Sequence, residues 1–348
     1  MKYILSDSIL FHDAFEDGVY ITAAGDKLIN IKEKEEEVFA IFEAFMKPRT
    51  YEEAYQKTCE EIFVIEDEFQ ETFEFMRTNN LLKEYDESQT TLNEFQLEKY
   101  KRQISSLASL PGNEKKDAKK MQQKICDSHV CIIGVGGTGS HLGLAMASIG
   151  VEKMTLIDFD KIELSNTSRQ ILYDETDVGK YKIDVAKEKL QKYNSRILID
   201  THNIHITSPD DLMFIGEKKI DLLICCADTP RGEIQRYVDA VCTKFHIPWF
   251  LYGPFQHSQI MVGPLFVPGK SKTYNEIYPP TLKTVSERVN KMNQNFVASI
   301  CDPYNGFASQ FAAIEAFKFL TGNSEPKILN RRYYVNTDEW EMEHVDYV

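Results

Sequence analysis

Four glycines in one short stretch form the clearest candidate site in the sequence: Gly134, Gly136, Gly137 and Gly139. The apolar run before them, residues 130–133, indicates a buried strand, and apolar residues between 142 and 149 indicate a helix that ends at Gly150. In such a unit the glycines allow a tight turn and the first helical amides point toward an anion. The stretch predicts a phosphate or nucleotide site, which a dehydrogenase could also have.

Charged and amide side chains follow the glycines. Asp158 ends a predicted strand 19 residues after Gly139, which suits a carboxylate that accepts from ribose hydroxyls. A dehydrogenase would share this feature too. Further candidates are Asp160, Asn166, Arg169, Gln170, Lys182 and Asp228.

The pattern of residues 158–182 resembles that of the ubiquitin-activating-like, ThiF/MoeB-type adenylating enzymes. The family pattern is D-x-D-x-[VI]-x-x-[ST]-N-x-x-R-Q followed by V-G-x-x-K, and the sequence contains both parts. The glycine turn, Ala227 with Asp228, and residues 99–103, where the family has R-Y-x-R-Q, also match. The resemblance covers roughly residues 95–340.

This resemblance implies ATP and Mg²⁺ as cofactors. The implied nucleotide-binding residues are Gly134, Gly136, Gly137, Gly139, Asp158, Asp160, Asn166 and Gln170, with the turn at the phosphates and Asp158 at the ribose. The implied catalytic residues are Arg102, Arg169, Lys182 and Asp228. Arg169 and Lys182, together with Asn166, would contact the triphosphate, and Asp228 would help hold Mg²⁺. Arg102 would act on the ATP of a neighbouring subunit, which implies a homodimer.

Several of these residues also have ordinary structural interpretations. Lys182 would be a solvated residue on a helix face, Asn166 a helix cap, and Asp228 an N-cap. The basic cluster at 99–103 would be a solvated helix face. The agreement of all these positions with one family pattern favours the functional interpretation.

Two features narrow the resemblance to peptide-antibiotic enzymes, those of microcin C and pantocin A biosynthesis. A small domain precedes the adenylating domain, and residues 263–269 fit the microcin C enzyme's version of that region. Many relatives bind structural zinc through two C-x-x-C pairs, one expected near 272–277 and one near the C-terminus. Neither pair is present, so we expect no zinc and a lid loop at about 270–300 held by packing. Cys301 is the one cysteine near this lid, and a catalytic thiol there is unsupported.

The element pattern predicts two domains. Residues 1–88 have short alternating segments and then three helical segments, one opened by a Thr50–Glu53 capping box. We expect a winged-helix-like α+β domain, and the resemblance to the peptide-antibiotic enzymes implies that it clamps a leader peptide by β-augmentation. Residues 89–348, after a polar linker at 86–95, have alternating strands and helices. We expect a Rossmann-like, doubly wound α/β domain that continues into antiparallel strands, a helix over 302–320 and a closing hairpin at 328–345.

Charge and composition exclude several classes of function. The net charge is −14, and residues 1–90 have 22 acidic against 9 basic side chains, so nucleic acid is not an expected partner. This acidity serves solubility or the docking of a basic segment. No apolar run approaches about 18 residues, so no membrane span is expected. The seven scattered cysteines and the lack of a signal-peptide pattern favour reduced thiols and a cytoplasmic location.

The favoured hypothesis is ATP-dependent activation of a carboxylate in a ribosomally made precursor peptide. That carboxylate is either a Glu or Asp side chain activated for condensation, as in pantocin A maturation, which the missing zinc pairs slightly favour, or the C-terminus, as in microcin C maturation. A ThiF/MoeB-type activator of a sulfur-carrier protein is a second hypothesis, disfavoured by the extra acidic domain. A nicotinamide-dependent oxidoreductase and an inert binding module are the others.

Overall fold

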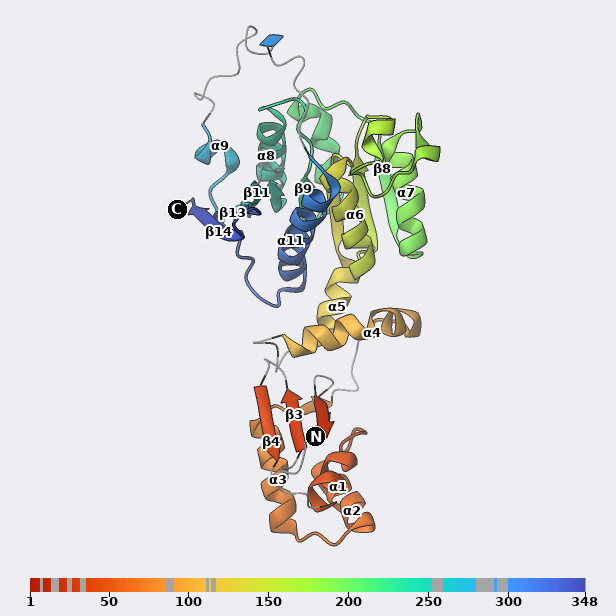
Figure 1. Cartoon of the computed structure of the whole chain (residues 1–348), viewed down its shortest axis with the longest axis vertical. Helices are drawn as coiled ribbons and strands as arrows, with labels where there is room; N and C mark the ends of the chain where they lie inside the picture. Colours follow the sequence, from red (N-terminus) through yellow and green to blue (C-terminus); the bar gives the residue numbers. More distant parts are fainter. Residues whose placement is uncertain are drawn as a thin grey trace. The chain divides into compact units, whose positions relative to one another are not determined.

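The computed structural model describes residues 1–6, 9–13, 19–23, 27–31, 36–85, 91–110, 113, 117–251, 259–279, 291–292 and 300–347. The chain separates into two compact units, Met1–Gln123 and Lys124–Val348, and each is described by itself (Figure 1). In the described part of the chain, no helix is long and apolar enough to cross a membrane.

The first unit is a small α+β structure. Strands β2 (Leu10–Asp13), β3 (Val19–Ala23) and β4 (Lys27–Ile31) form an antiparallel sheet, and β1 (Lys2–Leu5) pairs with β5 (Leu82–Tyr85). Helices α1 (Glu36–Ala44), α2 (Tyr51–Glu61) and α3 (Glu66–Thr78) enclose a core rich in aromatic side chains. The predicted capping box is confirmed, since Thr50 and Glu53 each accept the other's backbone N–H. The pairing of β1 with β5 was not predicted.

Two further helices follow in sequence. Helix α4 (Glu94–Ser109) begins inside the stretch predicted as a linker, because Asn93 and Gln96 form a second reciprocal capping box. Of that stretch, residues 86–90 lie outside the described part of the chain. Helix α5 (Ala118–Asp127) leads into the second unit.

The second unit is built on a six-stranded sheet with the order β12-β10-β9-β6-β7-β8. The five strands from β10 to β8 are parallel, and β12 is antiparallel to β10. The strands are β6 (His129–Ile133), β7 (Lys153–Ile157), β8 (Leu198–His202), β9 (Leu222–Cys225), β10 (Trp249–Leu251) and β12 (Leu265–Phe266).

Helices cover both faces of this sheet. Helices α6 (Gly137–Ile149), α7 (Lys182–Tyr193) and α11 (Asp302–Thr321) pack on one face, and α8 (Ile234–Phe245) with η3 (Pro209–Glu217) on the other. Along β6 the side chains alternate between the two cores, Val130 and Ile132 in one and Cys131 and Ile133 in the other. Helices α6 and α11 lie side by side (Figure 1). The predicted doubly wound fold is confirmed.

An antiparallel sheet completes the unit, in the order β11 (Gln259–Val262), β13 (Arg331–Asn336) and β14 (Glu341–Asp346). This is the predicted closing hairpin with one added strand. Of the predicted lid, the described residues include the short helix α9 (Tyr274–Ile277), whereas residues 280–290 and 293–299 lie outside the described part. Asp239 of α8 accepts hydrogen bonds from the Tyr274 and Asn275 amides, which fixes α9 on α8.

Candidate functional site

The glycine turn joins β6 to α6, and its backbone geometry requires glycine at two positions. Gly134 has φ +85°, and a Cβ there would lie 2.8 Å from the Ala227 nitrogen. A Cβ on Gly139 would lie 1.9 Å from the Gly134 carbonyl oxygen. The start of α6 therefore lies directly on the turn, and the turn lies directly on the segment after β9.

Two amide side chains lie against the next glycines. A Cβ on Gly136 would be 3.8 Å from Gln170 Nε2, and one on Gly137 would be 2.6 Å from Asn305 Nδ2. Gly136 occupies the N-cap of α6 and has no side chain with which to cap it. The first amides of the helix are thus suited to bind an anion such as phosphate.

Asp158 lies beside the turn, directly after β7. Its carboxylate accepts hydrogen bonds from the Val135 nitrogen at 2.7 Å and the Asp160 nitrogen at 2.8 Å. Burial raises the pKa of Asp158, while the charge of Lys182 and these two hydrogen bonds act to lower it. The carboxylate is therefore held in a fixed orientation, and each oxygen keeps a lone pair for a ribose hydroxyl.

Lys182 brings a buried positive charge to the same edge of the sheet. Its side chain is 8% exposed, and its Nζ lies 2.8 Å from Asp160 Oδ2, whereas Asp160 is 48% exposed. Lys182 is the first residue of α7, and its backbone nitrogen donates to the Asp160 carbonyl oxygen. Lys182 is therefore not a solvated residue on a helix face, which was the alternative structural interpretation of this position. An ammonium group here can bind a phosphate oxygen.

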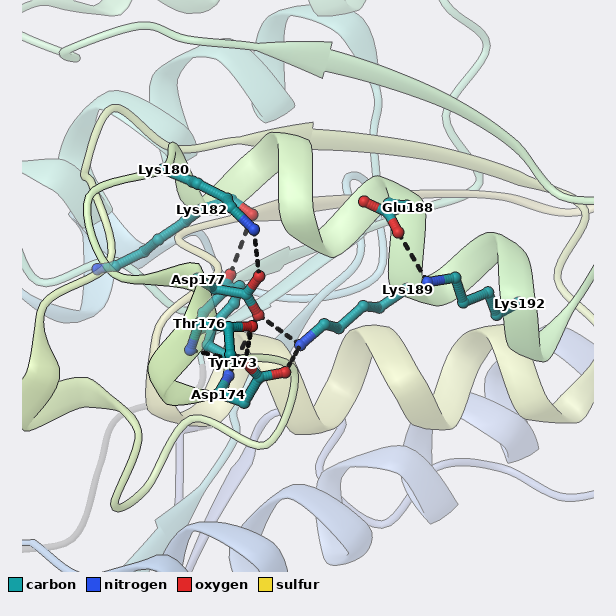
Figure 2. A network of polar contacts seen from close by, with 9 residues as sticks. All are labelled: Tyr173, Asp174, Thr176, Asp177, Lys180, Lys182, Glu188, Lys189 and Lys192. Carbon is teal, nitrogen blue, oxygen red and sulfur yellow. Dashed lines mark hydrogen bonds and ion pairs between the residues drawn. The ribbon is translucent and has the colours of Figure 1, made fainter.

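An ion-pair network holds the segment between Asp160 and Lys182 in place (Figure 2). Lys189 of α7 donates to Asp174 at 2.7 Å and to the buried Asp177, and Lys180 donates to Asp177 at 2.9 Å. Burial acts to raise the pKa of Asp177, but the hydrogen bonds from Lys189 and Lys180 outweigh it and the pKa is lowered. The loop is therefore fixed to α7 by charges that sequence reasoning missed.

Arg169 and Gln170 line a cavity of about 310 Å³ together with Thr167, Ser168, Ile171, Tyr173 and Asp302. Arg169 Nη1 donates to the Ser165 carbonyl oxygen at 2.7 Å. Gln170 is 4% exposed, and within the described part of the chain its buried Oε1 has no hydrogen-bond partner. Asn166 is buried, and its Oδ1 accepts from the Glu163 nitrogen at 3.1 Å. Asn166 therefore caps a short helical turn, as its alternative structural interpretation predicted.

Asp228 and Arg102 occupy different environments. Asp228 is exposed, three residues beyond β9, and follows the Ala227 backbone against which Gly134 packs. Arg102 belongs to the first unit and lies on the exposed side of α4 with Lys101 and Ser106. The second unit thus brings the other predicted residues to one edge of its sheet, and the role of Arg102 stays a prediction.

The donor set at this edge fits ATP. Lys182, Arg169 and the start of α6 suit phosphates, and Asp158 suits the ribose. Among the residues that the structure describes, no group of three or more His, Cys, Asp or Glu side chains could hold a metal ion. One exposed carboxylate, Asp228, still suits Mg²⁺, which proteins commonly bind through one or two carboxylates and the phosphates of the substrate.

Three residues near the turn were missed by sequence reasoning. The Tyr173 hydroxyl donates to the Val135 carbonyl oxygen at 2.8 Å. Asn305 lies on Gly137, and His141 of α6 pairs with Asp302 at 2.9 Å. The apolar pattern of residues 302–320 predicted helix α11 but none of these contacts, because they join segments that are distant in the sequence.

The comparisons with known proteins agree with this geometry. The model of the ThiF family matches residues 100–347. A crystal structure of E. coli MccB with AMPCPP and MccA is 26% identical, with a TM-score of 0.77, covering 100% of this chain and 97% of that one. The molybdopterin-synthase adenylyltransferase of Escherichia coli is 29% identical over 59% of this chain and 78% of its own length.

The match to ubiquitin-like modifier-activating enzyme 5 of Caenorhabditis briggsae, at 28% identity, covers 51% of this chain and 43% of the relative. The chain thus spans less than half the length of that relative. Both the ThiF/MoeB-type resemblance and the likeness to the microcin C enzyme are confirmed. The chain belongs to the ThiF family.

Proposed function

We propose that the protein uses ATP to adenylate a carboxylate of a ribosomally made precursor peptide. The carboxylate oxygen attacks the α-phosphorus, the bond from that phosphorus to the bridging oxygen of the β-phosphate breaks, and an acyl adenylate and pyrophosphate form. The observation that supports this most is the grouping of the glycine turn, Asp158 and Lys182 at one sheet edge. The ThiF family match supports the same reaction class.

Each residue has a task in this proposal. The turn amides bind phosphate, and Asp158 accepts from the ribose hydroxyls. Lys182 and Arg169 neutralise charge on the triphosphate as pyrophosphate leaves, which is the main contribution a protein makes to such a transfer. Asp228 would help hold Mg²⁺, which would supply further charge neutralisation.

A precursor peptide is proposed as substrate because the likeness to MccB covers the whole chain, including the first unit. The molybdopterin-synthase adenylyltransferase match, by contrast, covers 59% of the chain. MccB has been crystallised with MccA. We propose that the first unit binds the leader of the peptide, and that the protein is a homodimer in which Arg102 acts on the partner's ATP. We also propose that it needs no structural zinc.

The experiment combines the protein with ATP, Mg²⁺ and the product of a short reading frame next to the gene. We expect pyrophosphate to appear only with the peptide present, and free AMP to appear as well only if the activated carboxylate goes on to condense. A peptide that gains one adenylyl group indicates C-terminal nucleotidylation, and loss of water or carbon dioxide indicates side-chain condensation. No ATP consumption with the peptide would refute the proposal. Turnover with a small sulfur-carrier protein instead would favour the second hypothesis.

A further inference from the structure

Asn305, in the first turn of α11, contacts both the backbone of Arg169 and the start of α6. Its Nδ2 donates to the Arg169 carbonyl oxygen at 3.3 Å. The same amide lies on the first residue of α6, where a Cβ on Gly137 would be 2.6 Å from Nδ2 and 3.3 Å from Cγ. Asn305 is 1% exposed. One buried amide thus fixes both the backbone of Arg169 and the start of α6.

The energetics of this amide argue against a purely structural role. Among the residues that the structure describes, its Oδ1 has no hydrogen-bond partner. Leaving a buried acceptor unpaired costs more stability than one ordinary hydrogen bond contributes. A Leu side chain has the same branched shape and would avoid the cost of the unpaired oxygen. Stability alone therefore does not explain an amide at this position.

The rest of the α6–α11 interface does not need Asn305 to hold it together. His141 pairs with Asp302 at 2.9 Å, and Ser309 Oγ donates to the Thr138 carbonyl oxygen at 3.3 Å. Small side chains of α11, among them Ala308 and Ala312, are buried in the core beside α6. Asn305 is the residue in this row whose hydrogen bond reaches Arg169.

We propose that Asn305 is a positioning residue for triphosphate binding, which acts by fixing the Arg169 backbone against the start of α6. This inference rests on the proposed function, because it assigns Arg169 to the triphosphate. It goes beyond the family pattern, in which the residues of one subunit that contact its own ATP lie in the glycine turn and between 158 and 228.

The test measures binding of AMPCPP with Mg²⁺ by calorimetry, together with thermal unfolding. Asn305→Leu should bind AMPCPP about three- to tenfold more weakly, the equivalent of one lost hydrogen bond. Its binding of AMP should stay within about twofold, because AMP lacks the phosphates that Arg169 serves. Its unfolding temperature should be unchanged or higher. Asn305→Ala, which cannot clash, serves as a second variant.

Two further variants separate positioning from general loosening of the interface. Ser309→Ala removes a buried hydrogen bond one turn along α11 and should leave AMPCPP binding unchanged. Because Asn305 acts through Arg169, adding Asn305→Leu to an Arg169→Ala protein should weaken AMPCPP binding no further.

Three results would overturn the inference. These are unchanged AMPCPP binding in both Asn305 variants, an equal loss in Ser309→Ala, or a full additional loss in the double variant. If the unmodified protein binds no AMPCPP, the proposed function fails first and the inference with it. If the unmodified protein binds AMPCPP and both Asn305 variants bind it equally well, the inference alone fails.

Discussion

Replacing Gly139 by alanine tests how closely α6 lies on the glycine turn. The added Cβ would be 1.9 Å from the Gly134 carbonyl oxygen, whereas ordinary contacts begin at 3.4 Å. The obstacle is main chain, so a side-chain rotation cannot relieve it. The helix or the turn must therefore shift by about 1.5 Å, and the first amides of α6 shift with it.

The expected cost follows from this displacement. Overpacking in a well-packed region costs about 1–3 kcal/mol and occasionally more, and contact with main chain favours the upper part of that range. The helix propensity of alanine returns at most about 1 kcal/mol. We expect a net loss of about 2–3 kcal/mol in the free energy of unfolding, or about 4–12 °C in Tm for a unit of this size.

The matched control is Gly143→Ala, one turn further along α6. Its Cβ would be 3.5 Å from Leu190 Cδ1 and 3.8 Å from Ile132 Cδ1, which are ordinary contacts. We expect this variant to gain about 0.4–1 kcal/mol. Urea unfolding, monitored by circular dichroism, measures the free energy of unfolding of both variants. Equal stability of Gly139→Ala and the unmodified protein, or an equal loss in both variants, would refute the close packing described here.

Three further predictions concern charges. Lys182→Met should weaken AMPCPP binding about 10- to 100-fold, the loss of one charged hydrogen bond, and unchanged calorimetric affinity would contradict it. Lys189→Met should lower the free energy of unfolding by about 1–3 kcal/mol. The lowered pKa of Asp177 adds stability above about pH 4, and this stability is lost as the pH falls through the pKa of the folded state. Because the variant loses this contribution, its acid unfolding should begin at a higher pH. Lys192→Met, whose pair is exposed, should change neither. Burial lowers the pKa of His129, so the unfolded state binds a proton more readily than the folded state. The urea concentration at the unfolding midpoint should therefore decrease as the pH is lowered from about 6.5. An increase in that concentration over the same pH range would contradict this prediction.

Local patterns predicted much of the fold. The apolar run before Gly134 and the acids at Asp158 and Asp228 identified the parallel strands and the edge at which their side chains meet. The Thr50 capping box and the end of α11 at Gly322, which is left-handed with φ +66°, follow from side chains within a few residues. Such features can be predicted because each depends only on residues that are close together in the sequence.

Features that depend on distant residues were missed. Strand β5 is short and pairs with β1 from the other end of its unit. Strand β8 has the sequence Leu-Ile-Asp-Thr-His, whose polar residues hid an edge strand. The contacts of Asn305 with Arg169 and Gly137 join segments more than 130 residues apart. No periodicity reports such a contact, because it is set by the packing of α11 on α6.

The central claim is peptide-dependent adenylation, and ATP–pyrophosphate exchange tests it most directly. Labelled pyrophosphate should enter ATP only when the protein, Mg²⁺ and the precursor peptide are all present, because the acyl adenylate forms reversibly from the bound carboxylate. Exchange should be lost in the Lys182→Met variant. Release of ADP and phosphate without any exchange would contradict adenylation and indicate transfer of the γ-phosphate instead.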